Sequence, residues 1–519
     1  MTESRPAPGK WTVTITVLTG TMIAVLDSSI VNVALPNMAG TLGATIEEIT
    51  WVITAYILAN VIIMPIIGML SAHLGRKNIY LASVAVFTLA SMACGAAGSL
   101  PLIIVFRILQ GLGGGVLITV SQAILRETFP AEEQGLAMGI YGMGVVLAPA
   151  FGPTLGGWLT DTYSWPWIFY INVPIGIINV ILVQRYIIDP PYLRHDKGPI
   201  DFLGVGLLTT GLGAFQLMLE KGQEKDWFQS PFIVWLVVIA AIGMALFIWR
   251  EMETDHPAVD LRILKNRSFT AATSLGGILG MGLYGSLFIL PLFLQNNLGY
   301  PAMKAGLALM PRSLAMAVGM PLAGRFYNKL GPKFLIASGL LVGAYSFWGL
   351  GQLTPQTGFW DVLVPQVWQG IGFSLLFVAL STAALATIER RQMTAAAGLY
   401  NVVRQVFGSV GIAIAATQIT SGIDRSYAVL SEHVTVYDPA TRSWLATVTA
   451  GMMHRFGGDV GMARERALAL LHGSLLSQAA VLAYNRVFLL IAISFVLALP
   501  LVILITGGEA TEGAEIMVD

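Results

Sequence analysis

Apolar segments of bilayer-spanning length alternate with short polar segments along the whole of this 519-residue chain. One crossing of a membrane by an α-helix takes about 20 predominantly apolar residues. Segments that meet this requirement predict fourteen transmembrane helices, near residues 12–35, 49–70, 78–98, 102–123, 136–159, 166–187, 201–219, 231–249, 270–295, 304–324, 334–353, 362–387, 395–420 and 486–506. An even number of crossings places both ends of the chain on the same side of the membrane.

The composition supports an all-α polytopic membrane protein. Hydrophobic residues make up 55% of the chain and charged residues 11%, whereas soluble domains carry about 25% charged residues. The net charge of zero gives no indication of a nucleic-acid partner. The single cysteine, Cys94, forms no internal disulfide. No cleavable signal peptide is expected, because the first apolar segment is too long for one and no small-residue cleavage site follows it.

The distribution of Lys and Arg predicts the orientation in the membrane. With the N-terminus inside, the cytoplasmic loops, tails and helix ends hold 17 of the 29 Lys and Arg residues. The short outer loops then hold three. Because basic residues accumulate on the cytoplasmic side, both termini are expected in the cytoplasm.

Two short sequences recur at a nearly constant spacing. Gly68–Lys77 is similar to Gly324–Lys333, 256 residues later, and Gln110-Gly111 recurs as Gln369-Gly370. Such repeats predict two six-helix halves related by an axis along the membrane normal, with two further helices inserted between them. Chance similarity between glycine-rich helices is the alternative. The expected domains are a cytoplasmic N-terminus (1–11), an N-terminal bundle (12–187), a linker with the inserted pair (188–268), a C-terminal bundle (269–506) that includes a long outer loop (421–485), and a cytoplasmic tail (507–519).

Asp27 is the only carboxylate well inside a predicted span, and a buried acid at that depth indicates a functional site. Arg107 lies in the fourth predicted helix at a depth that differs by roughly 5 Å, at 1.5 Å of rise per residue. Burial favours the protonated form of a carboxyl group, and a nearby arginine favours its ionised form. Two interpretations stay open: the pair carries protons, or it is a static ion pair that joins two helices.

Other polar residues inside the predicted spans are candidates for the lining of a substrate cavity. Hydrogen bonding between helices is an equally good interpretation of each. They are Asn32, Gln110, Tyr141, Asn172, Gln295, Asn401, Arg404 and Gln405. Arg404 has no evident acidic partner in its helix, and such an arginine usually faces a watery cavity or helix carbonyls.

No pattern in the chain indicates catalysis. There is no nucleotide-binding loop, no metal-ligand cluster and no nucleophile constellation, and the run Gly113–Gly115 lies inside an apolar helix. We therefore expect neither an enzyme, nor a metal site, nor a cofactor.

Six motifs follow one another along the chain: Leu26–Pro36, Trp51–Tyr56, Arg107–Gly111, Gly144–Gly157, Trp165–Pro174 and Asn401–Arg404. In this order they resemble the fourteen-helix drug:proton antiporter branch of the major facilitators, the EmrB/QacA family. The resemblance implies a proton-coupled efflux antiporter that exports hydrophobic or amphipathic compounds by alternating access. It is closest to EmrB-type exporters of the bacterial inner membrane, which implies an EmrA-like periplasmic adaptor and a TolC-like outer-membrane channel as partners.

The resemblance also implies two moving parts. A hinge between the halves would comprise the small residues and prolines of the fifth helix, Gly144, Pro149, Gly152, Pro153, Gly156 and Gly157. A cytoplasmic gate would comprise Gly68, Gly75 and Arg76. Ordinary close packing of membrane helices and a plain basic loop are the alternatives. The gate departs from the family pattern, because Ala72 stands where an aspartate is usual and His73 where an arginine is usual.

The outer loop 421–485 is unusually long. It contains a polar stretch, Asp424–Arg442, then Gly457-Gly458, then Ala463–Ala483 with the apolar spacing of an amphipathic helix. It is either a disordered connector or a helical segment that lies on another surface, and the resemblance implies that the adaptor docks there.

Two functions other than drug export stay open. The chain could import or exchange one specific metabolite, which a narrow substrate profile would indicate. It could also be a scramblase or a scaffold of an envelope complex, for which no proton movement is expected when substrate is added.

Overall fold

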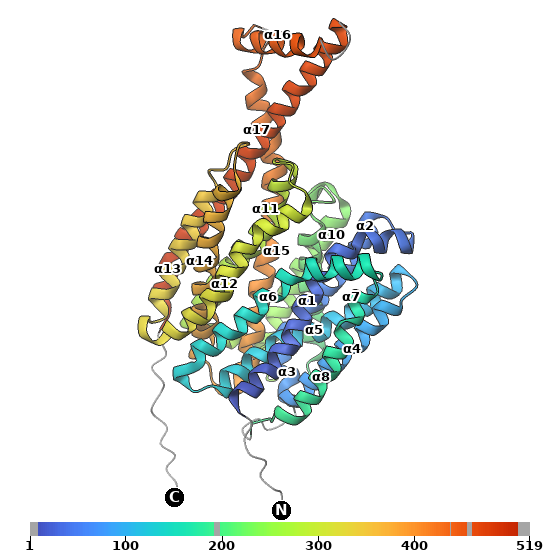
Figure 1. The fold of residues 1–519 in the computed structure, drawn as a ribbon. Helices are drawn as coiled ribbons and strands as arrows, with labels where there is room; N and C mark the ends of the chain where they lie inside the picture. The colour runs from blue at the N-terminus through green and yellow to red at the C-terminus, as the bar shows by residue number, and fades with distance from the viewer. Residues whose placement is uncertain (1–8, 191–197, 436, 454–458, 507–519) are drawn as a thin grey trace, which may run out of the picture.

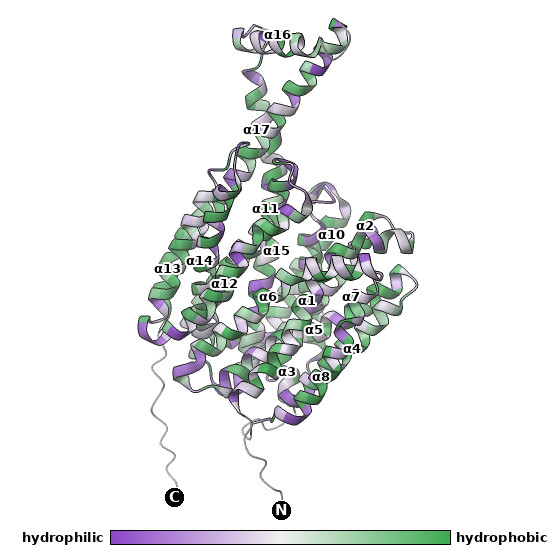
Figure 2. Ribbon diagram, viewed as in Figure 1, coloured by the Kyte–Doolittle hydropathy of each residue, from purple (hydrophilic) through white to green (hydrophobic). Residues whose placement is uncertain are grey.

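The computed structural model describes residues 9–190, 198–435, 437–453 and 459–506. Fourteen of its helices are long and apolar enough to cross a membrane, which confirms the number predicted from the sequence. They form one bundle of roughly aligned helices (Figure 1). Hydrophobic residues cover the middle of the bundle, whereas hydrophilic ones gather at its ends (Figure 2).

The first part of the chain forms one set of packed helices, which we call the N set. Its long helices are α1 (Lys10–Leu42), α3 (Trp51–Leu74), α4 (Arg76–Ala96), α5 (Leu100–Thr128), α6 (Gln134–Thr162) and α8 (Asn172–Tyr186), with the short helices α2 (Ile46–Ile49) and α7 (Trp167–Tyr170) between them. Within this set α1 packs on α5, α6 and α8, and α5 also packs on α3 and α4. Helix α1 is therefore enclosed by its own set.

The last part of the chain forms a corresponding set, the C set. Its helices are α11 (Arg267–Asn296), α12 (Ala302–Leu330), α13 (Pro332–Leu350), α14 (Phe359–Ala386), α15 (Met393–Glu432) and α17 (Val460–Leu497), and the chain continues into the 3-10 helix η5 (Leu499–Leu504). Helix α14 packs on α11, α12 and α13, while α15 packs on α11 and α17. The repeated loops also match in backbone conformation, because Gly75 and Gly331 have φ angles of 82° and 78° before α4 and α13.

The inserted pair, α9 (Phe202–Lys221) and α10 (Pro231–Glu253), lies beside both sets. Helix α9 packs on α3 of the N set and on α15 of the C set, and Gln216 Nε2 donates a hydrogen bond to Ser409 Oγ at 2.7 Å. In the loop after α9, an ion pair with Glu47 raises the pKa of Lys225. On α10, Trp235, Ile242 and Trp249 recur every seven residues and are exposed, as expected of a face that meets lipid.

The segment 421–485 differs from the predicted loop, because nearly all of its described part is helical. Helix α15 continues to Glu432, and α17 begins at Val460 rather than near residue 486. These two extensions pack on each other beyond the rest of the bundle, and α16 (Pro439–Met453) lies across their tip (Figure 1). We call this unit the hairpin.

The predicted amphipathic helix Ala463–Ala483 is confirmed as part of α17, but it packs on α15 and α16 rather than lying on the bundle. Within the hairpin, Tyr427 Oη and His472 Nδ1 are 2.9 Å apart. The pair Gly457-Gly458 lies outside the described residues, as do residues 1–8 and 507–519 of the predicted tails.

The N and C sets approach each other most closely at the end of the bundle where α1 begins and η5 ends, which we call the termini end (Figure 1). A Cβ atom on Gly135 would lie 2.7 Å from Gly324 O, and one on Gly68 would lie 2.5 Å from Ala395 Cβ. Asn328 Nδ2 also donates a hydrogen bond to Glu132 O at 2.6 Å. Glycine is therefore required here because helix backbones of the two sets touch.

This close approach predicts a difference between two glycines of α12. In Gly324→Ala the new Cβ would lie 2.3 Å from Gly135 O, so the sets are forced apart at a cost of about 1–3 kcal/mol. In Gly306→Ala the new Cβ meets nothing within 4 Å. We expect a lower apparent melting temperature of the detergent-purified protein for Gly324→Ala alone. Equal melting temperatures of the two variants would contradict the assigned contact.

Candidate functional site

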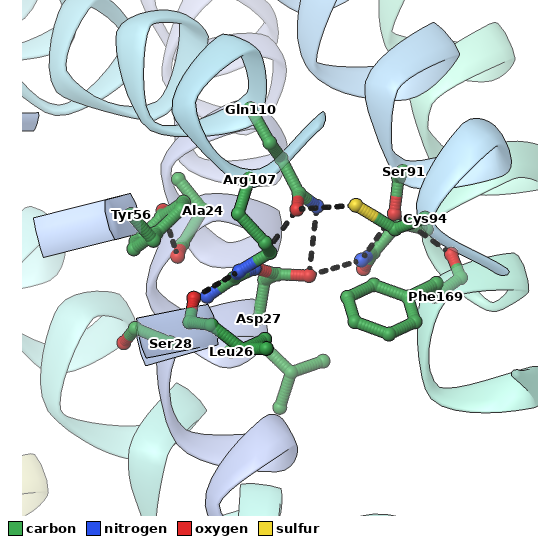
Figure 3. Close-up of polar contacts among 12 residues, drawn as sticks. Ala24, Leu26, Asp27, Ser28, Tyr56, Ser91, Cys94, Arg107, Gln110 and Phe169 are labelled. Carbon is green, nitrogen blue, oxygen red and sulfur yellow. Dashed lines mark hydrogen bonds and ion pairs between the residues drawn. The ribbon is translucent and has the colours of Figure 1, made fainter. Parts of the chain in front are cut away.

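Asp27 lies in the middle of α1 and is completely buried. Its Oδ2 forms an ion pair with Arg107 Nη1 of α5 (Figure 3). Its Oδ1 accepts hydrogen bonds from Gln110 Nε2 at 2.9 Å and from Asn172 Nδ2 at 2.8 Å. Three side chains from α5 and α8 thus hold the carboxylate. Asp27 and Arg107 are in direct contact, whereas the sequence indicated only that they lie at similar depths in the membrane.

Arg107 is equally enclosed. Its Nε donates a hydrogen bond to Val52 O at 2.9 Å, and its Nη1 also donates to Gln110 Oε1 at 2.8 Å. The guanidinium carbon lies 4.2 Å from the centroid of the Tyr56 ring, a cation–π contact. Tyr56 is fixed in turn by a hydrogen bond from its Oη to Ala24 O at 2.8 Å. Only Nη2 is buried without a partner among the described residues.

This arrangement couples the charge of one group to the position of another. An ionised Asp27 neutralises Arg107, and the two hydrogen bonds from Gln110 and Asn172 also favour the ionised form. If Asp27 takes up a proton, Arg107 becomes a buried cation without a counter-ion, which costs several kcal/mol in a medium of low polarity. Protonation of the cluster therefore favours rearrangement of α1 against α5.

Gln110 and Asn172, two of the candidates for the cavity lining, donate hydrogen bonds to Asp27 in this cluster. Asn172 also donates to Ser91 Oγ at 3.1 Å, which extends the cluster to α4. Asn32 and Gln295 are exposed and do not reach it. Helix rotation decides which of these polar residues point toward Asp27, and hydrophobicity along the chain does not reveal it.

The remaining cavity candidates lie nearer the junction of the two sets. Asn401 Nδ2 of α15 donates to Gln122 Oε1 of α5 at 2.6 Å, a hydrogen bond between the sets. Tyr141 Oη donates to Ile118 O at 3.0 Å, and Gln405 Oε1 accepts from Tyr284 Oη at 3.1 Å.

Arg404 of α15 is buried and forms no ion pair in the described part of the chain. Its guanidinium carbon lies 5.0 Å from the centroid of the Phe377 ring and 5.8 Å from that of Tyr400. Its Nη1 has no hydrogen-bond partner among the residues described. The aromatic faces stabilise the cation, but they leave it able to bind an anion.

Arg76, at the start of α4, joins the two sets at the termini end. It forms an ion pair with Glu127 of α5. Its Nε donates to Thr394 Oγ1 at 2.8 Å and its Nη2 to Arg390 O at 3.0 Å, both in the C set. Glu127 thus supplies a carboxylate to Arg76 at the predicted gate, although the loop has Ala72 where the family usually has an aspartate. Sequence reasoning missed Glu127 because it lies at the far end of another helix.

The small residues of α6 have two different partners. Gly152 and Gly156 face α1, where added Cβ atoms would lie 2.0 Å from Ser29 Oγ and 2.7 Å from Ile30 O. Gly144 also packs on α1, while Pro149 and Pro153 lie inside α6. Contact with the C set comes from Gly135, Gly139 and Gly142 instead. The glycines among the predicted hinge residues therefore pack α6 against the helix that carries Asp27.

Two corresponding sets of six long helices, an inserted pair that brings the number of candidate membrane spans to fourteen, and a buried acid–base pair in the N set are features of a multi-pass membrane transporter. The chain belongs to the major facilitator superfamily, which matches residues 17–412, and within it to the family of EmrB and FarB. It is 35% identical to the fatty acid resistance protein FarB of Neisseria gonorrhoeae, over 94% of this chain and 95% of FarB. It is 34% identical to the multidrug export protein EmrB of Escherichia coli K12, over 97% of each chain.

Solved structures share the fold at low sequence identity. The human organic anion transporter MFSD10 superposes with a TM-score of 0.61 at 13% identity, covering 94% of this chain and all of that one. The proton:xylose symporter XylE superposes with a TM-score of 0.56 at 14% identity, covering 93% and 94%. The superfamily consists of transporters, so the protein is not an enzyme.

The contact of α6 with α1 predicts opposite outcomes for two neighbouring glycines. In Gly152→Ala the Cβ would lie 2.9 Å from Ser29 Cβ and 3.2 Å from Ile30 N. Helix α1 therefore has to move at Ser29, which lies two residues after Asp27. In Gly157→Ala the nearest atom, Val33 Cγ1, is 3.8 Å away. We expect Gly152→Ala to reduce transport at normal expression and Gly157→Ala to leave it unchanged. Full transport by Gly152→Ala would contradict the importance of this contact.

Proposed function

We propose that the protein is a proton-coupled antiporter that exports hydrophobic and amphipathic compounds across a bacterial inner membrane. The observation that carries the proposal is the sealed cluster of Asp27, Arg107, Gln110 and Asn172, which is a proton site with its own counter-ion. Relatives named for multidrug export and fatty acid resistance, each matched over nearly the whole chain, support export as the direction.

The two halves, 12–187 and 269–506, alternate in giving access to a site between them. The termini end is cytoplasmic, as the distribution of basic residues predicts, and the contacts of Arg76 with Arg390 and Thr394 close that side. This is the arrangement of an outward-facing state. Protonation of Asp27 from outside releases Arg107, α1 moves with α6, and the cytoplasmic side opens for a new substrate. Release of the proton inside restores the ion pair.

The substrate binds between the halves, among Tyr141, Asn401, Arg404 and Gln405. Arg404 gives this site a positive potential, since Phe377 and Tyr400 contact the cation without neutralising it. Aromatic faces accommodate flat hydrophobic compounds without strict geometry. A site of this kind discriminates by size and polarity more than by shape.

The proton role of Asp27 predicts a separation of binding from transport. Asp27→Asn keeps the size of the side chain but removes its charge and its titration. We expect proteoliposomes of this variant to lose drug-induced proton movement and gradient-driven efflux, while drug binding to the purified protein stays unchanged.

Neutralisation of a carboxylate at the end of a span serves as the control. Glu220→Gln, at the end of α9, is expected to keep both activities, because Glu220 accepts a hydrogen bond from Gln216 and takes part in none of the ion pairs between described residues. Full gradient-driven efflux by Asp27→Asn would refute the proton role. A narrow substrate profile with intact coupling would instead favour a facilitator of one metabolite.

The hairpin is the docking site of a periplasmic adaptor within a tripartite pump that reaches a TolC-like channel. It extends beyond the bundle on the side opposite the termini end (Figure 1). Large side chains are exposed along it: Tyr437 is 88% exposed, and Leu468 and Leu470 are each about half exposed. Exposed apolar side chains on a projecting element are typical of a surface that a partner covers.

Replacement of residues 433–459 by a short flexible linker removes α16 and leaves α15 and α17 paired through Tyr427 and His472. We expect this variant to transport normally in vesicles but to lose drug resistance in cells that have an outer membrane. The matched control is Tyr427→Phe in the intact chain, which removes one hydrogen bond and leaves the tip in place. Normal resistance after the replacement would contradict docking at the tip.

A further inference from the structure

Arg312 is a second buried arginine that the proposed transport cycle does not use. It lies on α12, is 2% exposed, and donates from Nη1 to Ser286 Oγ at 2.9 Å and to Gln369 Oε1 at 3.4 Å. Neither its Nε nor its Nη2 makes a hydrogen bond to a residue that the structure describes, and none of the six ion pairs involves it. The Arg312 cation is therefore hydrogen-bonded to a hydroxyl and an amide oxygen but has no counter-ion among the described residues.

Two glutamines of α14 beside it also lack partners. Gln369 Nε2 and both polar atoms of Gln366 are buried and make no hydrogen bond within the described chain. Gln366 lies one turn before Gly370, where a Cβ would lie 2.5 Å from Arg312 O, so it faces the same part of α12. Buried donors without an acceptor are costly. One acceptor group with negative charge would accept hydrogen bonds from Arg312 and from the Nε2 groups of Gln366 and Gln369.

The internal repeat relates this cluster to that of Asp27. A Cβ atom added to Gly111 would lie 2.4 Å from Tyr56 O, and one added to Gly370 would lie 2.5 Å from Arg312 O. Arg312 thus takes the place of Tyr56, 256 residues later, and Gln369 takes that of Gln110. In the C set the hydroxyl of Ser286, from the first helix of that set, contacts the arginine where the carboxylate of Asp27 does so in the N set.

The surroundings of Arg312 suit an amphipathic ligand. Met316 and Met320 follow Arg312 on the same face of α12 and are buried. An added Cβ on Gly142 of the N set would lie 2.8 Å from both Met320 Sδ and Phe377 Cε1. The apolar stripe that begins at Arg312 therefore leads to the junction of the two sets, and methionine and phenylalanine adapt to varied hydrophobic shapes.

We propose that Arg312, Gln366, Gln369 and Ser286 bind the carboxylate of amphipathic organic acids, whose apolar part lies along Met316 and Met320. The carboxylate supplies the charge that Ser286 lacks, and a guanidinium with free N–H groups binds it strongly. The inference rests on the proposed export function for its substrate. It places a cationic site for the substrate in one half of the repeat and the proton site in the other.

The test measures binding of naphthoate and of neutral naphthylmethanol to the purified full-length protein by intrinsic tryptophan fluorescence. Arg312→Gln is expected to weaken naphthoate binding by about tenfold or more, because a charged hydrogen bond is lost, and to leave naphthylmethanol binding unchanged. Unchanged naphthylmethanol affinity also shows that the variant is folded. Equal naphthoate affinity in Arg312→Gln and wild type would overturn the proposal.

A second variant supplies the missing carboxylate from the protein itself. Ser286→Asp gives Arg312 the kind of partner that Arg107 has, so naphthoate binding should be lost, whereas the uncharged Ser286→Asn should retain it. Chloride binding is measured in the same way, to distinguish a site for inorganic anions. If Arg312→Gln loses chloride binding but keeps naphthoate binding, the cluster binds an inorganic anion and the carboxylate assignment is wrong. No gradient is used, and Asp27→Asn is expected to bind naphthoate normally, so failure of proton coupling is distinguishable from failure of this site.

Discussion

Charge in the interior of this bundle is costly unless the protein itself balances it, because hydrocarbon offers neither water nor ions. The pair of Asp27 and Arg107 meets this constraint completely, with Gln110 and Asn172 fixing the carboxylate and Tyr56 covering the cation. Nearly every helix of the N set contributes to that balance. A change in the charge of Asp27 would therefore affect the packing of several helices together, unlike a change at a single exposed carboxylate.

The second constraint is how closely helices can approach. One group of glycine contacts determines where the two sets touch: Gly135 with Gly324, and Gly68 with Ala395. A second contact, at Gly152, determines where α6 meets α1. The first group forms the closed end of the molecule, and the second lies beside the ion pair. Helix α6 takes part in both, so it is the element through which a change near Asp27 reaches the junction with the C set.

The number of helices and the position of Asp27 inside a span could be predicted from the sequence because both depend on hydrophobicity along the chain. The repeat could be predicted because two short sequences recur at a nearly constant spacing. The contacts of Gln110 and Asn172 could not, because they depend on how each helix is rotated. Glu127 was missed as the partner of Arg76 for a related reason, since nothing local relates the two. The helix over 463–483 could be predicted from its apolar spacing. Its pairing with a continued α15 could not, because the length of a bilayer crossing says nothing about a helix that continues beyond it against another helix.

Helix α15 has 40 residues and runs without interruption from the contacts of Thr394 with Arg76, past Arg404, to the tip of the hairpin. Such a helix is about 60 Å long at 1.5 Å per residue, so a tilt of about 10° at its base displaces the tip by about 10 Å. The helix therefore acts as a lever: its first residues contact Arg76 at the termini end, and its last residues stand outside the bundle. A protein bound at the tip would therefore sense mechanically which side of the transporter is open.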